Sequence, residues 1–379
     1  MSKNIAIVAH KYLTQPDDDL VIYLNKNKYK NVLHIRHSFN EAEDRCSYYT
    51  WYRDGAFCKE ERSRDYKNWP EPLIYLKELF YTVKWVVGSK LVWDYYIGMD
   101  GLCTLSGELL KFIKKVEKTV YWVIDFVPGN RFDSELKNRI YKFINVSGYK
   151  NSDEVWDLSP RMAEARENLW GIPKSIYKVQ KVVPYGVWRD RIKKYSYTEC
   201  ERTTLVYMGI LIPKQGVQLV IQALPQLIKN IPGLKFKIIG GGEYRIELKN
   251  LASSLGVGEY CDFKGKIEED EVLEAEIAKS CVAIAPYIKS LDTWTYYADP
   301  GKIKKYLACG VPPVLTDLPW MSKQIRDSNA GIVIEENIEN IVDAVTKLMQ
   351  PEINDIYRKN AVEFSASFDY NVIFSSLFT

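Results

Sequence analysis

Three absences narrow the classes of protein that this sequence can encode. It contains only three histidines, and its seven cysteines are scattered without a Cys-x-x-Cys pair. No uncharged apolar stretch reaches the ~18 residues of a membrane-spanning helix. The cysteine pattern argues against a zinc site or a disulfide framework and favours a reducing compartment, so we expect a cytoplasmic protein. The N-terminal residues also lack the apolar run of a signal peptide.

A strong excess of one charge is absent too. The chain has 52 Lys and Arg residues against 49 Asp and Glu residues, a net charge of +3. This balance gives no reason to expect a nucleic-acid partner. The length of 379 residues exceeds what one hydrophobic core usually spans, so we expect two domains.

Short apolar runs rich in β-branched residues alternate with amphipathic stretches along the chain. Strands are expected at residues 5–9, 32–35, 120–124, 154–158, 179–183, 204–208, 234–239, 260–263, 281–285, 313–315 and 331–334. Helices are expected at residues 216–230, 243–255, 270–279 and 337–349. This alternation predicts an α/β fold with parallel sheets covered on both faces, and ligand sites just after the carboxyl ends of strands. The polar residues 188–202 are expected to link the two domains.

The first half of the chain is less regular. Residues 46–72 are rich in charge and aromatic side chains without a clear period, which predicts a long insertion or an acceptor-side loop. Residues 73–93 mix Leu, Val and aromatic residues with four lysines. This segment fits a helix lying on an anionic membrane surface, and it fits equally a core helix whose lysines reach out to water.

Three motifs in the second half occur in a fixed order. They are LVYMGILIPKQGVQLVIQALPQLIKNIPGLKFKIIGGGE, LASSLGVGEYCDFKGKI and CVAIAPYIKSLDTWTYYADPGKIKKYLACGVPPVLTD. Together they resemble the C-terminal domain of GT-B glycosyltransferases, specifically the family 4-like retaining enzymes known as glycosyl transferases group 1. The resemblance implies two Rossmann-like domains facing each other across a cleft. Residues 1–190 would bind the acceptor, joined by a C-terminal helix at 363–379, and residues 200–362 would bind the nucleotide-sugar.

The resemblance also implies an activity. It predicts a hexosyltransferase-like, retaining enzyme of glycan or polysaccharide biosynthesis. Such an enzyme moves a sugar from a UDP- or GDP-sugar to a hydroxyl of a saccharide or lipid-linked saccharide. The aromatic and basic first half adds the expectation of contact with a membrane surface, so that the protein would be peripheral on the inner membrane face.

A nucleotide-sugar site must stabilise its leaving group, because negative charge grows on the β-phosphate as the glycosidic bond breaks. Helix N-termini and backbone N–H groups can do this without a metal, so we expect neither a metal nor another cofactor. Helices are expected to start after Gly216 and after Gly301, and Lys302 adds a cation at the second start. The three glycines 240–242 either let the backbone approach the diphosphate or the donor sugar closely, or form a tight turn between a strand and a helix. From these arguments and the resemblance, the donor-binding candidates are Gly209, Lys214, Gln215, Gly241, Gly242, Ile267, Tyr297, Asp299, Gly301, Lys302 and Lys305.

Several positions depart from the resembled family. Its members carry Arg where this chain has Ile210 and Lys where it has Gln215. They also carry two glutamates eight residues apart, at the positions of Tyr297 and Lys305, and Asp299 is the nearest carboxylate. Two alternatives therefore stay open: a non-catalytic nucleotide-sugar-binding subunit and a GT-B sugar-nucleotide epimerase.

Candidate catalytic residues follow strands of the first half. Asp125 follows the strand expected at 120–124, where a carboxylate could activate an acceptor hydroxyl, or merely cap the next element. His10 and His37 end the first two strands and are expected on the acceptor side. The run Asp17-Asp18-Asp19 is interpreted as a loop or a helix N-terminus rather than a metal site.

Overall fold

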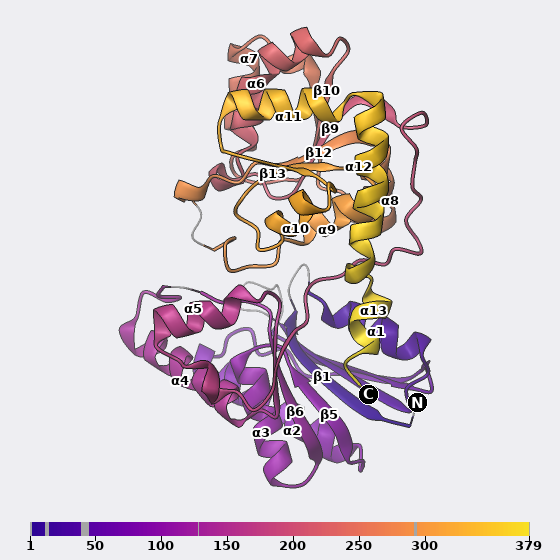
Figure 1. The fold of residues 1–379 in the computed structure, drawn as a ribbon. Helices are drawn as coiled ribbons and strands as arrows, with labels where there is room; N and C mark the ends of the chain where they lie inside the picture. The colour runs from indigo at the N-terminus through magenta and orange to yellow at the C-terminus, as the bar shows by residue number, and fades with distance from the viewer. Residues whose placement is uncertain (1, 12–14, 39–44, 128, 292–293, 379) are drawn as a thin grey trace. The chain divides into compact units, whose positions relative to one another are not determined.

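The computed structural model describes residues 2–11, 15–38, 45–127, 129–291 and 294–378 of the chain. They form two compact units, Met1–Pro184 and Tyr185–Thr379, and each is a sheet with helices packed on it (Figure 1). The predicted linker at 188–202 lies inside the second unit, and residues 363–379 are grouped with that unit as well. The expected association of residues 363–379 with the first domain stays a prediction.

The first unit is built on an eight-stranded sheet in the order β4-β3-β2-β1-β5-β6-β7-β8. Its strands are β1 (Asn4–Lys11), β2 (Asn31–Ser38), β3 (Ser47–Arg53), β4 (Ala56–Arg62), β5 (Trp93–Gly98), β6 (Val116–Val123), β7 (Glu154–Asp157) and β8 (Gln180–Val182). Its helices are α1 (Asp17–Lys26), α2 (Glu71–Gly88), α3 (Gly101–Phe112), α4 (Glu135–Asn151) and α5 (Arg161–Trp170). All neighbouring strands pair in parallel except β3 and β4, which are antiparallel.

The β3–β4 hairpin corrects the expectation of a long irregular insertion at residues 46–72. Tyr49 and Trp51 of β3 pack on the core beneath α2, whereas β4 is almost entirely exposed and carries mostly polar and charged side chains. Charged residues are common on edge strands because they discourage pairing with other chains. Asp54 and Gly55 make the turn with φ of 50° and 83°. Because β4 is mostly exposed and charged, its sequence lacks the alternation of apolar and polar residues from which a hairpin is predicted.

The second unit has a six-stranded sheet in the order β11-β10-β9-β12-β13-β14, with every pair parallel. Its strands are β9 (Glu201–Met208), β10 (Lys235–Ile239), β11 (Cys261–Gly265), β12 (Ser280–Ala285), β13 (Pro313–Thr316) and β14 (Ile332–Ile334). This is the strand order of the doubly wound nucleotide-binding fold. The two Rossmann-like sheets confirm the predicted α/β fold class.

Helices cover both faces of the second sheet (Figure 1). The helices of this unit are α6 (Val217–Asn230), α7 (Arg245–Ser254), α8 (Asp270–Ala278), α9 (Gly301–Ala308), α10 (Ser322–Asp327), α11 (Ile338–Leu348) and α12 (Pro351–Phe364), followed near the C-terminus by α13 (Tyr370–Ser375). One hydrophobic core joins the sheet to α6, α7 and α11, and a second core joins its other face to α8 and α9. Burial on both faces explains why β12 and β13 appear in the sequence as continuous apolar runs, whereas the edge strand β11 alternates between half-buried and exposed residues.

The second unit begins and ends with segments that pair with each other. The Val187 N–H donates to the Phe368 carbonyl at 2.9 Å, and the Tyr370 N–H donates to the Val187 carbonyl at 3.1 Å. Gly186 permits this contact, since an added Cβ would lie 2.6 Å from the Tyr370 ring. Residues near 187 and near 369 are therefore part of one packed structure.

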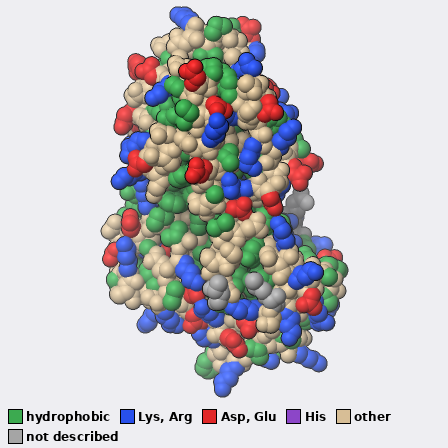
Figure 2. Space-filling view, turned by 45° about the vertical axis from the view of Figure 1, so that its right-hand side comes forward, with side chains coloured by type: hydrophobic (Ala, Val, Ile, Leu, Met, Phe, Trp, Pro, Cys, Tyr) green, Lys and Arg blue, Asp and Glu red, His purple; other side chains and the backbone are tan. Residues whose placement is uncertain are grey.

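Charged side chains of both signs lie on the face of the protein that Figure 2 shows. On the face shown in Figure 2, basic and acidic side chains are interspersed, as the near-balanced composition predicts. In this view, no large area carries only positive or only negative side chains.

Candidate functional site

The strand order of the second sheet reverses between β9 and β12, so ligands are expected beyond the carboxyl ends of these strands. The loops that follow β9 and β10 are tied together there. The Gly209 N–H donates to the Ile239 carbonyl at 2.9 Å, and the Leu211 N–H donates to the Gly241 carbonyl at 2.8 Å. This edge brings together several of the predicted donor-binding residues.

The three glycines after β10 have different reasons to be glycine. Gly240 and Gly242 have φ of 141° and 153°, and an added Cβ would lie 1.9 Å from the Gly209 carbonyl oxygen and 2.3 Å from the Leu211 carbonyl oxygen, respectively. Both are therefore required by the packing of the loop itself. Gly241 would meet nothing within 4 Å. Of the two interpretations of this turn, close packing accounts for Gly240 and Gly242 and leaves Gly241 open to a ligand.

Lys302 brings a cation to the end of β9. Its ammonium lies 2.5 Å from Gln215 Oε1 and 3.2 Å from Tyr207 Oη, and it sits over the Tyr207 and Tyr287 rings at 4.5 and 5.1 Å. It is also 2.7 Å from the position that a Cβ on Gly209 would occupy. Three predicted residues, Gly209, Gln215 and Lys302, thus lie within contact of one another, and Gln215 orients the lysine.

The N-terminus of α9 is next to this lysine in the chain. Pro300 precedes the helix, and no side chain caps its first turn. An added Cβ on Gly301 would meet only Tyr185 Cβ, at 4.0 Å, so the approach to the first turn is unobstructed on that side. Exposed N–H groups at a helix start can bind an anion.

Asp299 has partners within the protein. It accepts hydrogen bonds from the Tyr185 N–H at 2.7 Å and from Trp320 Nε1 at 3.0 Å, and it forms an ion pair with Lys304. Burial lowers the pKa of Lys304 to about 8, although the charge of Asp299 opposes that shift. The Asp299 carboxylate fixes the loop before α9, and its predicted ligand contact stays a prediction.

Lys305 and Tyr297 stand where the resembled family has its two glutamates. The Lys305 ammonium lies 2.7 Å from Asp270 Oδ1 and 3.4 Å from Glu274 Oε1, and Arg191 contacts Glu274 at 2.7 Å. Burial alone would raise the pKa of Asp270, but its bonds to Lys305 and Arg191 lower it. The charges at this position are therefore inverted, with the carboxylates on α8 and a lysine on α9. Tyr297 is half-buried.

Two further predicted residues lie near this edge, Lys214 in a short 3₁₀ helix (Pro213–Gln215) and Ile267 in the loop after β11. The Lys214 carbonyl accepts from the Ile288 N–H at 3.0 Å, and the Lys214 ammonium is 6.0 Å from the centre of the Trp294 ring. Ile267 is half-buried against the core beneath α8 and α9. Nothing in these contacts assigns either residue to a ligand.

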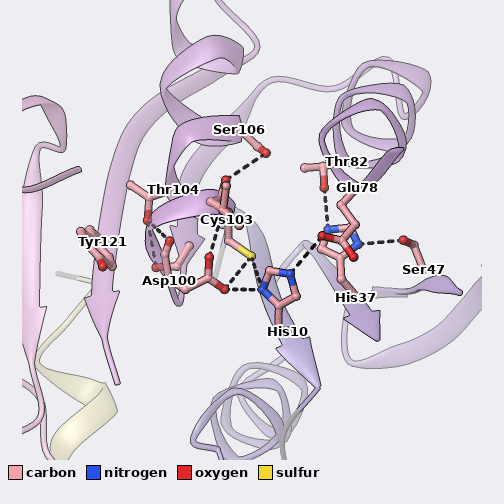
Figure 3. Close-up of polar contacts among 12 residues, drawn as sticks. His10, His37, Ser47, Glu78, Thr82, Asp100, Cys103, Thr104, Ser106 and Tyr121 are labelled. Carbon is pink, nitrogen blue, oxygen red and sulfur yellow. Dashed lines mark hydrogen bonds and ion pairs between the residues drawn. The ribbon is translucent and has the colours of Figure 1, made fainter. Parts of the chain in front are cut away.

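A second polar cluster lies at the carboxyl edge of the first sheet, beside the corresponding reversal between β1 and β5 (Figure 3). His10 Nδ1 is 2.5 Å from Asp100 Oδ2, and His10 Nε2 is 3.1 Å from Glu78 Oε2. Cys103 Sγ is 3.1 Å from the same Asp100 oxygen and 3.6 Å from His10 Nδ1. Burial alone lowers the pKa of His10, but Asp100 and Cys103 raise it well above its ordinary value.

His37 is buried beside His10, with ring centroids 5.6 Å apart. Its nitrogens contact Ser47 Oγ at 2.8 Å and Thr82 Oγ1 at 2.9 Å. Burial, together with the charges of His10 and Lys77, lowers the pKa of His37 well below its ordinary value, so this ring is neutral. The roles of both histidines toward an acceptor stay predictions.

Asp125 follows β6 by two residues, as predicted. Its side chain is half-exposed and pairs with Arg131 at 3.2 Å, while the Arg131 guanidinium lies over the Tyr141 ring. A carboxylate in this position is accessible and oriented by one cation. Its catalytic role stays a prediction.

Three residues of the first-unit cluster are missing from the sequence prediction: Glu78, Asp100 and Cys103. Asp100 caps α3 by accepting from the Cys103 N–H at 2.8 Å. The sequence does carry a signal for it, because Asp100-Gly101 follows the apolar end of β5. The sequence does not predict β5, because aromatic and charged residues interrupt its apolar run.

Two groups of side chains within the described residues bring metal-binding atoms within 4.8 Å of one another. They are His10, Asp100 and Cys103, and Asp17, Asp18 and His34. The run Asp17–Asp19 forms the first turn of α1, which confirms its interpretation as a helix N-terminus. Asp17 in this turn lies beside β2, where His34 Nε2 is 2.9 Å from Asp17 Oδ2.

Two Rossmann-like units, each with polar residues at the carboxyl edge where its strand order reverses, define the GT-B class of architecture. The second unit carries the family signature. Residues 189–365 match the family model described as glycosyl transferases group 1, which confirms the predicted resemblance.

Curated relatives agree with this assignment. A GDP-mannose-dependent α-(1-6)-phosphatidylinositol monomannoside mannosyltransferase of Mycolicibacterium smegmatis is 31% identical over 180 residues, 44% of this chain and 46% of that protein. An uncharacterized glycosyltransferase of Haemophilus influenzae is 26% identical over 269 residues, 70% of this chain and 69% of that protein. The match to the mannosyltransferases thus spans less than half of their length.

Solved structures show the fold along the whole chain. Sucrose-phosphate synthase of Thermosynechococcus elongatus has a TM-score of 0.69 at 15% identity, covering 98% of this chain and 96% of that one. Anabaena Alr3699/HepE in complex with UDP also has a TM-score of 0.69, at 14% identity, covering 99% and 98%. No helix among the described residues is long and apolar enough to cross a membrane.

Proposed function

We propose that this protein is a glycosyltransferase that moves a sugar from a nucleotide-diphosphate donor to a hydroxyl of a saccharide or lipid-linked saccharide. The observation that carries the proposal is the Lys302 ammonium, held by Gln215 at the switch point of a group 1 domain. Beside it are the N-terminus of α9 and the unobstructed turn at Gly241. A cation, a helix dipole and backbone N–H groups are the means by which a protein stabilises charge on a departing diphosphate.

In this proposal each group has a stated task. Lys302 and the first turn of α9 bind the diphosphate and stabilise the charge that grows on its β-phosphate. Asp125 accepts the proton of the attacking hydroxyl or stabilises the developing oxocarbenium ion. The donor is a UDP- or GDP-sugar, the transferred group is a hexosyl unit, and the anomeric configuration is retained, as in the family that the second unit matches. No metal takes part in these steps.

We further place the enzyme on the cytoplasmic face of a membrane, where lipid-linked acceptors reside. α3 packs between α2 and α4, and the outward sides of these three helices carry large exposed apolar side chains, which we name the α2–α4 face. They are Leu73, Leu76, Phe80, Leu105, Leu109, Phe112, Leu136, Ile140 and Phe143, with exposed fractions from 38% to 85%. Exposed basic residues stand among them: Lys84, Lys114, Lys137, Arg139 and Lys142. Apolar residues interleaved with cations are typical of helices that lie on anionic lipid.

Vesicle co-sedimentation tests this placement. The protein should sediment with vesicles containing phosphatidylglycerol more than with phosphatidylcholine alone. The triple substitution Leu76→Ser, Phe80→Ser, Phe112→Ser should abolish sedimentation at an unchanged melting temperature. The matched control is Ile246→Ser with Ile356→Ser, two exposed apolar residues of the second unit. Equal sedimentation of both variants would refute the α2–α4 face as the contact.

The activity itself is tested with a panel of UDP- and GDP-sugars. We expect one nucleotide to raise the melting temperature and its sugar to be consumed with nucleotide release when saccharide or lipid-linked acceptors are added. Binding without turnover would instead support a non-catalytic subunit, and isomerised donor would support an epimerase. Absence of nucleotide binding would refute all three.

A further inference from the structure

The cluster at the carboxyl edge of the first sheet has a geometry that hydrogen bonding alone does not require. Asp100 Oδ2 accepts from both the His10 imidazole and the Cys103 thiol. In addition, the sulfur lies 3.6 Å from His10 Nδ1, so the three atoms contact one another pairwise (Figure 3). Two hydrogen bonds to one oxygen need only two of these contacts. A cation shared by three ligand atoms favours all three.

We propose that His10 Nδ1, Asp100 Oδ2 and Cys103 Sγ form a zinc site, an inference independent of the glycosyltransferase activity. Imidazole, carboxylate and thiolate ligands together are typical of Zn²⁺, which takes four ligands in a tetrahedron. Three protein ligands leave one position for water. The proposal departs from the expectation of no metal, which rests on the scattered cysteines and on the chemistry of the donor site.

The distances are close to those that zinc needs. With bonds of about 2.0–2.3 Å, tetrahedral ligand atoms lie roughly 3.3–3.8 Å apart. The two contacts of the Cys103 sulfur, at 3.1 and 3.6 Å, are near this range. Only the pair His10 Nδ1 and Asp100 Oδ2, at 2.5 Å, has to open, by about 1 Å. The Asp100 side chain is 34% exposed and can move, and that opening also gives the ion a path inward.

The groups around these ligands match the surroundings of known zinc sites. Histidine ligands usually donate their other ring N–H to a carboxylate, which fixes the ring. Glu78 Oε2 lies 3.1 Å from His10 Nε2, and Lys77 stands 3.8 Å from the other Glu78 oxygen. The second oxygen of Asp100 is held by the Cys103 N–H at 2.8 Å.

Proton and charge balance is kept when the ion enters. Zn²⁺ displaces one proton from His10 Nδ1 and one from the Cys103 thiol, so two positive charges leave and two arrive. The bonds formed are Zn–N, Zn–O and Zn–S, and no oxidant or reductant is needed. The buried carboxylate of Glu78 keeps its partners, the His10 Nε2–H and the Lys77 ammonium.

The test is metal binding by the full chain after chelator treatment. Zinc should bind at one ion per chain and raise the melting temperature. Co²⁺ as a probe should give the near-ultraviolet absorption of a thiolate–cobalt bond. In Cys103→Ser this absorption should vanish, and zinc should no longer raise the melting temperature. The control Cys309→Ser, at a buried cysteine of the second unit, should behave as the wild type.

Glu78→Gln separates a zinc site from a general effect on folding. It should lower zinc affinity by about 10- to 100-fold while keeping the thiolate band, because Glu78 only orients His10. Zinc bound far below one ion per chain would overturn the proposal. So would a thiolate–cobalt band that persists in Cys103→Ser.

Discussion

The Lys302 ammonium lies 2.5 Å from Gln215 Oε1 and 3.2 Å from Tyr207 Oη, two neutral groups that fix its position at the end of β9. An anion brought to the end of β9 would therefore meet a cation whose position is already fixed. A charge-assisted hydrogen bond is worth about 1.5–3 kcal/mol. Lys302 is therefore the central residue of the proposed donor site.

Lys302→Ala should accordingly weaken the binding of UDP or GDP by about 10- to 100-fold, because a charged contact of this strength is lost. Isothermal titration calorimetry measures the change directly. Lys229→Ala, at an exposed lysine on α6, serves as the control. Unchanged nucleotide affinity in Lys302→Ala would remove the lysine from the donor site.

Asp125→Asn tests the acceptor side. Loss of a general base costs typically 10²- to 10⁴-fold in turnover, while the donor affinity should stay near that of the wild type. The readouts are kcat for nucleotide release and the dissociation constant of the nucleotide. Asp133→Asn, at an exposed carboxylate a few residues further along the chain, is the matched control. Normal turnover in the Asp125 variant would contradict its assignment.

The buried pair of Arg166 and Asp157 makes a prediction about stability. Both side chains are fully buried, and two guanidinium nitrogens contact the two carboxylate oxygens at 2.7 and 2.6 Å. Asp157→Asn should lower the free energy of unfolding by about 3–5 kcal/mol, because it leaves a buried cation uncompensated. Urea denaturation measures this loss. A smaller loss in the double substitution Arg166→Met, Asp157→Leu would show that the uncompensated charge is the cause.

At the scale of single residues, the sequence predicts a site residue when the short motif around that residue is enough to identify it. Gly209, Gln215 and Lys302 are predicted from the family resemblance together with the expected helix starts, and the structure brings these three together. Glu78 is not predicted, because it meets His10 only once α2 packs near the end of β1, 68 residues away along the chain. Which side chains meet across such packing is not contained in any local pattern.

At the scale of elements, the glycines in the turn after β10 have different roles: the packing of the loop requires Gly240, whereas Gly241 is free to contact a ligand. Gly241→Ala should leave the melting temperature unchanged, since its added Cβ meets nothing within 4 Å. If the donor approaches this turn, the same substitution should weaken nucleotide binding severalfold, because the methyl group occupies the approach. Thermal unfolding and calorimetry together test both halves of the statement.

Gly240→Ala is the contrasting substitution. Its Cβ would lie 1.9 Å from the Gly209 carbonyl oxygen, and its φ of 141° is strained for alanine, so the melting temperature should fall by several degrees. A stable Gly240→Ala protein, or a destabilised Gly241→Ala protein, would reverse the roles that we assign.

The sequence predicts elements well where both faces of a strand are buried. The sequence predicts all six strands of the second unit, and continuous apolar runs mark the buried strands β12 and β13 most clearly, whereas the edge strand β11 lacks such a run. β3, β4 and β5 were missed. The hairpin has a charged outer strand, and β5 begins with Trp93-Asp94-Tyr95, where polar atoms break the apolar run. The helix expected at 73–93 exists as α2, but it stops at Gly88 so that β5 can form.

For the whole molecule, ion-paired carboxylates in both units predict acid sensitivity. Burial alone would raise the pKa of Asp153 and of Asp270, but hydrogen bonds and charges from Lys111 and Lys305, respectively, lower both. Carboxylates whose folded pKa is depressed stabilise the fold above their unfolded pKa of about 4, and this stabilisation is lost as the pH falls through the folded pKa.

The melting temperature should therefore decline gently from pH 7 to about pH 5, because the unfolded state protonates His37 and the folded state does not, and it should fall more steeply below about pH 4 as the carboxylates protonate. Lys111→Met removes one of the two lysines that pair with Asp153, so this variant should start from a lower melting temperature and lose less on acidification. A melting temperature that stays level down to about pH 3 in the wild type would contradict the role of these ion pairs.

The pairing of Val187 with Phe368 and Tyr370 has a consequence for biosynthesis. Residue 187 leaves the ribosome about 180 residues before its partners do, which at about 5–20 residues per second is a delay on the order of ten seconds or more. The first unit can fold during that interval, whereas the second must wait with its starting segment unmatched. A nascent chain stalled before residue 368 should therefore expose the second half to proteases and chaperones while the first half already resists digestion.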